Sequence, residues 1–280
     1  MRLATLSAVA SYLLVLAVSP AWAETFTVVA FNVESGGADP SKVAADMRAI
    51  PGVDIWGLSE VQNGKVADEV FLEAAKDAGP GKFRYLLSRS GRADRLAIIY
   101  NTDKFDLIEA QELLGMRLRP DGSLSFQMRG QLSARLRLKG TDKEFHFAVN
   151  HLKCCDNTAR DLAWRSAQID YIRDWVQASP LPKVVVGDFN TPLPPSQDDT
   201  AGTEVGKIVE GGVLEWLRPP PTNRPPTHCG GSTLDYVFVA GDAKQWSGTA
   251  EVLFPEPDYC TRDASDFADH RPLKAVFEVQ

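Results

Sequence analysis

Short segments in which apolar residues alternate with polar ones, or run together for a few positions, recur along most of the chain. Alternation with a period of two is typical of a β-strand with one buried face, and a short apolar run is typical of a strand buried on both faces. These patterns predict strands at 25–33, 53–60, 83–89, 95–100, 105–114, 130–138, 144–152, 183–188, 233–239, 249–254 and 272–279.

Helical spacing of apolar residues is rarer, and it predicts helices only at 41–49, 65–78 and 158–178. In the last segment the residues on one side are Leu162, Ile169, Ile172 and Val176. The proline-rich stretches 192–195 and 218–226 predict loops, because proline removes a backbone donor and fixes φ. Many strands with few helices between them indicate an α/β fold of two packed mixed sheets with helices outside, in one domain spanning 24–280.

Residues 1–23 have the pattern of a secretory signal peptide. Arg2 precedes an apolar stretch from Ala8 to Val18, and "SPAWA" then ends in a small-residue cleavage pattern before Glu24. The apolar stretch is short for a bilayer span, which favours cleavage over an uncleaved anchor. We expect a periplasmic or secreted protein with no membrane anchor after cleavage and no obligate protein partner.

The charge balance argues against a protein held on nucleic acid by bulk charge. The whole chain has a formal net charge of −7, and loss of Arg2 with the signal peptide brings it to −8. A local basic strip remains compatible with this balance. The candidate residues of this basic strip are Arg89, Arg92, Arg95, Arg117, Arg119 and Arg129. The alternative interpretation is that these arginines are only solvated loop residues.

The chain contains four cysteines, which in an exported protein indicate disulfides. They lack the CxxC spacing of a zinc site, and three pairings are open. If strands 233–239 and 249–254 form a hairpin, its open end brings Cys229 and Cys260 together, so we predict that bridge. Cys154 and Cys155 are left as a vicinal pair, as free thiols or with other partners.

Several predicted strands carry a polar residue at the end of an apolar face. In each of four strands, the polar residue continues the face formed by every second apolar residue before it. Asn32 continues the face of Phe26, Val28 and Ala30, and Glu60 continues that of Trp56 and Leu58. His151 continues the face of Phe145, Phe147 and Val149, and Asp188 continues that of Val184 and Val186, with Asn190 two residues later. Asp235 and the pair Asp269-His270 instead precede their strands. If those two strands run antiparallel to the others, all these polar groups lie along one edge.

A single such residue is more often a strand-end cap or a hydrogen-bonded core group. Repetition favours a functional site. Asparagine, glutamate, aspartate and histidine together suit an acid–base site with a hard metal ion, because oxygen ligands match magnesium, manganese or calcium.

The motifs "AFNV", "GLSEV", "VNHL", "VVVGDFN", "TLDYVFV" and "ADHRPL", in this order, resemble the endonuclease/exonuclease/phosphatase superfamily. That group includes deoxyribonucleases, abasic-site endonucleases, bacterial sphingomyelinases and inositol polyphosphate phosphatases. The resemblance covers nearly the whole mature chain. It implies a four-layered sandwich of two mixed β-sheets flanked by helices, with one divalent-metal site at its mouth.

The resemblance also implies roles for individual residues. Glu60 would be the direct metal ligand, Asn32 would orient the metal site, and Asp269 would lie near the metal. The expected ion is Mg²⁺, with Mn²⁺ or Ca²⁺ as alternatives. His270 would be the general base, oriented by Asp235. Asp188 and Asn190 would position the water and the phosphoryl oxygens, and His151 would donate to the phosphate. Arg95 departs from the usual small residue and is a candidate phosphate contact, whereas Glu34, His146 and His228 are expected outside the catalytic core.

Substrate choice follows from elimination among the branches. The segment "STLDYVF" differs from the inositol phosphatase pattern, and the abasic-site branch is intracellular. We therefore expect a phosphoester substrate that is a nucleic acid, cleaved by a nuclease or phosphodiesterase. The alternatives are a phosphomonoesterase, a sphingomyelinase-like phospholipid phosphodiesterase, and a non-catalytic binding scaffold.

Overall fold

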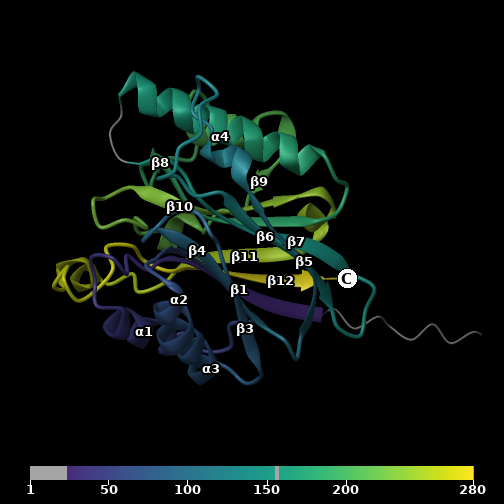
Figure 1. The fold of residues 1–280 in the computed structure, drawn as a ribbon, viewed down its shortest axis with the longest axis vertical. Helices are drawn as coiled ribbons and strands as arrows, with labels where there is room; N and C mark the ends of the chain where they lie inside the picture. The colour runs from purple at the N-terminus through teal and green to yellow at the C-terminus, as the bar shows by residue number, and fades with distance from the viewer. Residues whose placement is uncertain (1–23, 155–157, 280) are drawn as a thin grey trace, which may run out of the picture.

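The computed structural model describes residues 24–154 and 158–279. Two six-stranded sheets pack face to face and helices cover their outer faces, which confirms the predicted four-layered α/β sandwich (Figure 1). The predicted signal peptide lies outside the described residues. Within the described ranges, none of the helices combines the length and apolar character needed to cross a bilayer.

The first sheet has the strand order β11-β12-β1-β2-β4-β3. Strands β1 and β2 are parallel, and every other pair in this sheet is antiparallel. The bounds are Glu24–Asn32 for β1, Ile55–Val61 for β2, Phe83–Leu87 for β3, Arg95–Asn101 for β4, Ser247–Val252 for β11 and Leu273–Val279 for β12.

The second sheet has the order β5-β6-β7-β8-β10-β9. Its one parallel pair is β7 with β8. The bounds are Phe105–Leu113 for β5, Gln131–Leu138 for β6, Glu144–His151 for β7, Lys183–Leu193 for β8, Glu215–Trp216 for β9 and Thr233–Ala240 for β10.

Helices form the two outer layers (Figure 1). The first sheet is covered by α1 (Pro40–Arg48), α2 (Gly64–Val66), the π-helical turn η1 (Ala67–Leu72) and α3 (Glu73–Ala78). The second is covered by α4 (Ala159–Gln177) and α5 (Glu204–Val209). Short 3₁₀ turns are η2 (Leu114–Arg117), η3 (Glu210–Gly212), η4 (Pro221–Asn223), η5 (Gly241–Gln245) and η6 (Pro257–Thr261).

The core between the sheets comes from alternate residues of the facing strands. At the end away from the polar strand termini, Phe26 stacks between Phe145 and Phe277, with ring centroids 5.2 Å from each. Nearer the site the sheets approach closely, because a Cβ on Gly57 would lie 2.7 Å from Val186. This packing fixes how far apart the two sheets hold their terminal side chains.

Some sequence predictions were wrong in detail. Leu162 is exposed rather than buried in α4, where Asp161 and Arg165 occupy buried positions near the amino end. Strand β8 continues to Leu193, into the segment predicted as a loop, and β9 was missed because it has only two residues.

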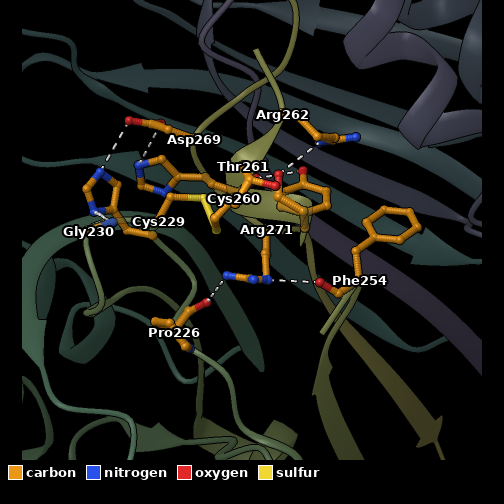
Figure 2. Close-up of a disulfide and its surroundings, with 12 residues drawn as sticks. Pro226, Cys229, Gly230, Phe254, Cys260, Thr261, Arg262, Asp269 and Arg271 are labelled. Atoms are coloured by element: carbon orange, nitrogen blue, oxygen red, sulfur yellow. Dashed lines mark hydrogen bonds and ion pairs between the residues drawn. A yellow bond between two sulfur atoms is a disulfide. The ribbon is translucent and has the colours of Figure 1, made fainter. Parts of the chain in front are cut away.

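The predicted Cys229–Cys260 disulfide is present (Figure 2), but the strand pairings lack the hairpin from which it was predicted. Strand β10 pairs with β8 and β9, whereas β11 pairs with β12 in the other sheet. The cysteines meet because the segment before β10 runs beside the segment before β12, where the Cys229 N–H donates to the Asp269 carbonyl oxygen at 2.8 Å. Cys154 is also disulfide-bonded, which excludes a free thiol there, and Cys155 lies outside the described residues.

We predict that replacing both Cys229 and Cys260 by alanine lowers the free energy of unfolding by about 2–4 kcal/mol, because the bridge closes a loop in the unfolded chain. The two positions are separated by 31 residues. Urea unfolding of the oxidised protein and of the double variant measures the difference. Equal midpoints and slopes would contradict the prediction.

Candidate active site

The polar strand termini meet at one edge of the sandwich. Strands β1, β2 and β7 end there, β8 passes through this edge at Asp188, and the antiparallel strands β10 and β12 begin there. A cavity of about 400 Å³ opens at this edge. Its lining residues are Glu34, Glu60, His151, Cys154, Arg165, Asp188, Asn190, Pro192, His228, Gly230, Ser232, Leu234, Asp269 and His270.

Glu60 reaches the cavity through a β-bulge rather than through regular alternation. Trp56 and Leu58 face the helices, so the predicted shared face for Glu60 was wrong. The pairing of β2 with β4 shifts register between Leu58 and Val61, and Glu60 has a positive φ of 62°. The extra residue turns the Glu60 side chain towards the second sheet.

A second irregularity presents the end of "VVGDFN". Asn190 has a φ of 49° where β8 and β10 lose register, and Gly187 has a φ of 127°. A Cβ on Gly187 would lie 2.1 Å from the carbonyl oxygen of Asn150, so only glycine allows β7 and β8 to approach this closely. The resulting register places His151 opposite Asp188.

Two carboxylates from different sheets converge on one amide. The Asn32 Nδ2 donates to Glu60 Oε1 at 2.8 Å and to Asp188 Oδ2 at 3.2 Å. The Nε2 of His151 lies 3.7 Å from the same Glu60 oxygen and 3.5 Å from the same Asp188 oxygen. Burial raises the pKa of Glu60, against the Asn32 hydrogen bond, and raises the pKa of Asp188 to about 6.

His151 is buried, and its surroundings disfavour the charged imidazolium. Burial holds its pKa well below the usual value, and the neighbouring Arg129 and His270 act in the same direction. A neutral imidazole can still donate one N–H. Asn190 is also a donor: its Nδ2 contacts the Leu152 carbonyl oxygen at 3.2 Å, and an amide nitrogen has a second hydrogen.

His270 and Asp235 form a buried pair behind the cavity. The His270 Nδ1 lies 2.7 Å from Asp235 Oδ2, so Asp235 accepts the Nδ1 hydrogen and leaves Nε2 facing the cavity. That Nε2 is 3.7 Å from Asp188 Oδ2 and 3.7 Å from Asp269 Oδ1. Burial opposes the charged imidazolium, but Asp235, Asp188 and Asp269 outweigh it and raise the pKa of His270 to about 10.

Two groups of side chains bring metal-ligating atoms close together in the described part of the chain. One consists of Glu60, Asp94 and His151, and the other of His228, Asp269 and His270. The predicted metal residues Glu60 and Asp269 therefore belong to different groups. The carboxylate oxygens of half-buried Glu60 and buried Asp188 share the Asn32 amide and are the kind of ligand that a hard divalent cation prefers.

The arginines predicted as substrate contacts behave differently from one another. Arg95 lies at the start of β4 opposite Val61, donates from Nε to the Arg92 carbonyl oxygen, and does not line the cavity. Arg129 is buried and paired with Asp94 at 2.9 Å, which removes it from the predicted basic strip. Arg89, Arg92 and Arg119 are exposed.

Two residues that line the cavity, Glu34 and His228, were predicted to lie outside the catalytic core. Glu34 accepts a hydrogen bond from the Asp269 backbone N–H at 3.1 Å, and burial and Asp269 raise the pKa of its carboxyl group. His228 lies 3.2 Å from Asp269 Oδ2. The signal in the sequence that could have indicated His228 is its place directly before Cys229, because the predicted bridge joins Cys229 to Cys260, which precedes Asp269-His270 in the sequence.

Comparison with solved structures finds the same fold in several proteins. An endonuclease/exonuclease/phosphatase family protein from Bacteroides thetaiotaomicron aligns with a TM-score of 0.66 and 19% sequence identity. The alignment covers 93% of this chain and 100% of that chain. The mannosyl-6-phosphatase Bt3783 of the same organism has a TM-score of 0.60 and 19% sequence identity, over 89% of this chain and 98% of that chain. D. rerio TDP2 in complex with a single-strand DNA product has a TM-score of 0.65 and 14% sequence identity, over 90% of this chain and 98% of that chain. At these identities the likeness shows the fold alone.

A search of curated proteins by sequence gives no match. The model of the Endonuclease/Exonuclease/phosphatase family, in contrast, matches residues 29–270. That range includes every polar strand terminus from Asn32 to His270. The chain belongs to the endonuclease/exonuclease/phosphatase family.

Proposed function

We propose that this protein is an exported, divalent-metal-dependent phosphodiesterase that cleaves nucleic acid by in-line attack of water on phosphorus. The family supports phosphoester hydrolysis in general. The observation that carries the proposal is the His270–Asp235 pair, whose free Nε2 faces Asp188 across a cavity that Glu60, His151 and Asn190 also line.

The side chains divide the work of this reaction between them. The Nε2 of His270 accepts the proton of the attacking water, and Asp235 holds the ring in the required tautomer and stabilises the imidazolium that forms. Asp188 accepts a hydrogen bond from the water and orients it. Asn190 and His151 donate to phosphoryl oxygens, where negative charge accumulates in the transition state.

Glu60 and Asp188 would hold the cation, with Asn32 orienting both carboxylates. When bound, a divalent cation supplies Lewis-acid polarisation of a phosphoryl oxygen. Magnesium is the expected ion because the two proposed ligands are hard carboxylate oxygen atoms.

The charge of the cavity favours a diester over a monoester. Its described lining includes the carboxylates of Glu34, Glu60, Asp188 and Asp269. Its arginine, Arg165, is paired with Glu204, at 2.9 Å from Nε to Oε1. The two positive charges of a bound cation would offset only part of this set of four carboxylates. A monoester carries up to about two negative charges near neutral pH and a diester one, so the monoester meets greater repulsion from the remaining carboxylates.

Nucleic acid is the proposed diester because exposed arginines flank this edge of the molecule. Arg89 and Arg92 lie in the segment before β4, the strand whose first residue is opposite Val61, next to Glu60. Export is proposed from the signal-peptide pattern of residues 1–23, with cleavage before Glu24, and the disulfide is consistent with an oxidising compartment. The natural location would then be the periplasm or the medium.

The metal requirement gives the first test of this function. We expect hydrolysis of bis(p-nitrophenyl) phosphate to stop in EDTA and to return with magnesium or manganese. Glu60→Gln should require a higher metal concentration by at least ~10-fold, because it loses a direct ligand. The control Glu69→Gln changes an exposed helical glutamate and should respond like the unaltered protein. Full turnover after removal of metal would refute the requirement.

The titration of His270 gives a second test. Without metal its pKa of about 10 keeps the ring protonated at neutral pH, which is unsuitable for a base. A cation among the carboxylates opposes the imidazolium, so adding magnesium should lower this pKa, and the rate should rise with pH through the lowered value. NMR of the labelled ring, with and without magnesium, measures both values. A pKa unaffected by a saturating cation would contradict this electrostatic account.

Salt dependence tests the substrate. Alanine at Arg89, Arg92 or Arg119 should reduce cleavage of DNA at subsaturating concentration, and each lost phosphate contact should lessen the log–log salt slope by about 0.7–0.9. Hydrolysis of the small diester should change little. Arg84→Ala, an exposed arginine on β3 near the opposite end of β4, is the matched control. Rapid phosphate release from monoesters without DNA cleavage would instead identify a phosphomonoesterase.

A further inference from the structure

His228 makes contacts that go beyond a structural role in its loop. It lies in the segment before β10, forms a β-bridge with His270, and packs its ring against the His270 ring with centroids 4.9 Å apart. Its imidazole also lines the cavity. The family resemblance gave this residue no role.

The hydrogen bonds of His228 define its tautomer. The Gly230 backbone N–H donates to His228 Nδ1 at 3.0 Å, so Nδ1 carries no hydrogen. In the neutral ring the hydrogen must then be on Nε2. The His228 Nε2 lies 3.2 Å from Asp269 Oδ2 and donates to it.

Two side chains hold the Asp269 carboxylate, His228 through its Nε2 and Glu34 through its carboxyl group. The Asp269 backbone is held on both sides, because its N–H donates to Glu34 and its carbonyl oxygen accepts from Cys229. Its carboxylate is 44% exposed, with Oδ2 on His228 and Oδ1 at 3.7 Å from the His270 Nε2. With Oδ2 on His228, the other carboxylate oxygen is the one nearer the proposed base.

The turn that contains His228 holds the ring in place. The His228 N–H donates to the Ser232 carbonyl oxygen at 3.0 Å, and the Cys229–Cys260 disulfide ties the next residue to the segment before β12 (Figure 2). A Cβ on Gly230 would lie 2.7 Å from the His228 ring, so only glycine brings its N–H against Nδ1 without displacing the imidazole.

We propose that His228 is a positioning residue for the hydrolytic reaction: through its Nε2 hydrogen it fixes the Asp269 carboxylate against His270 Nε2. This inference rests on the proposed function of His270 as the base. The turn 228–232 and its disulfide then serve the site directly, because they set the tautomer and place of one imidazole.

The test compares variants that keep or remove the donor. His228→Leu should lower kcat on bis(p-nitrophenyl) phosphate by about 10–100-fold, the cost typical of losing an outer partner of a site residue. His228→Gln retains an N–H donor and should recover most of the rate. His146→Leu removes a buried histidine on the far face of β7 and should keep full activity. Melting temperatures identify losses that come from unfolding.

A second measurement does not depend on turnover. Nitrogen-15 spectra of the labelled imidazoles should show that the hydrogen of neutral His228 is on Nε2 and that Nδ1 accepts. An Nδ1–H tautomer, or equal rates for the leucine variant and the unaltered protein, would overturn the proposal. If the unaltered protein hydrolyses no phosphoester, the proposed function fails, and the tautomer still decides whether His228 is held as described.

Discussion

The amide of Asn32 joins the two halves of this site. It donates to Glu60 from its own sheet and to Asp188 from the other, so it fixes two carboxylates that repel each other in a buried setting. Neither acid could approach this closely without a shared donor or a cation. The site therefore depends on the distance between the sheets, which the packing of Gly57 against Val186 and the stacked phenylalanines around Phe26 establish.

Backbone strain is concentrated at the same edge. Glu34, Glu60 and Asn190 all have positive φ values although none is glycine. Residues in sparsely populated backbone regions cost on the order of 1–3 kcal/mol each, and they persist where the surrounding structure over-determines them. Here regular strands on both sides impose the bulges, and the bulges turn the side chains into the cavity. Backbone strain at three lining residues is typical of functional sites.

The electrostatics couple the base to the proposed cation. Asp235, Asp188 and Asp269 raise the pKa of His270 to about 10, and one of these carboxylates, Asp188, is also a proposed ligand of the cation. A cation would thus assemble the ligands and release the base in one event. His228 extends this arrangement outwards, because the Asp269 carboxylate that it contacts is one of the groups acting on His270.

The sequence alone determined the sandwich and most members of the site, because strand alternation and motif order are local properties. It placed Asn32, His151, Asp188 and Asp235 on the faces that the structure shows, at the correct edge. The route of Glu60 into the cavity was decided by tertiary structure, since a bulge depends on pairing with β4. Tertiary structure also decided which strands pair with β10 and β11, and it buried Arg129 against Asp94. It likewise placed Glu34 and His228 in the lining of the cavity. Each of these results from contacts between segments distant in the sequence, which no local pattern of residues records.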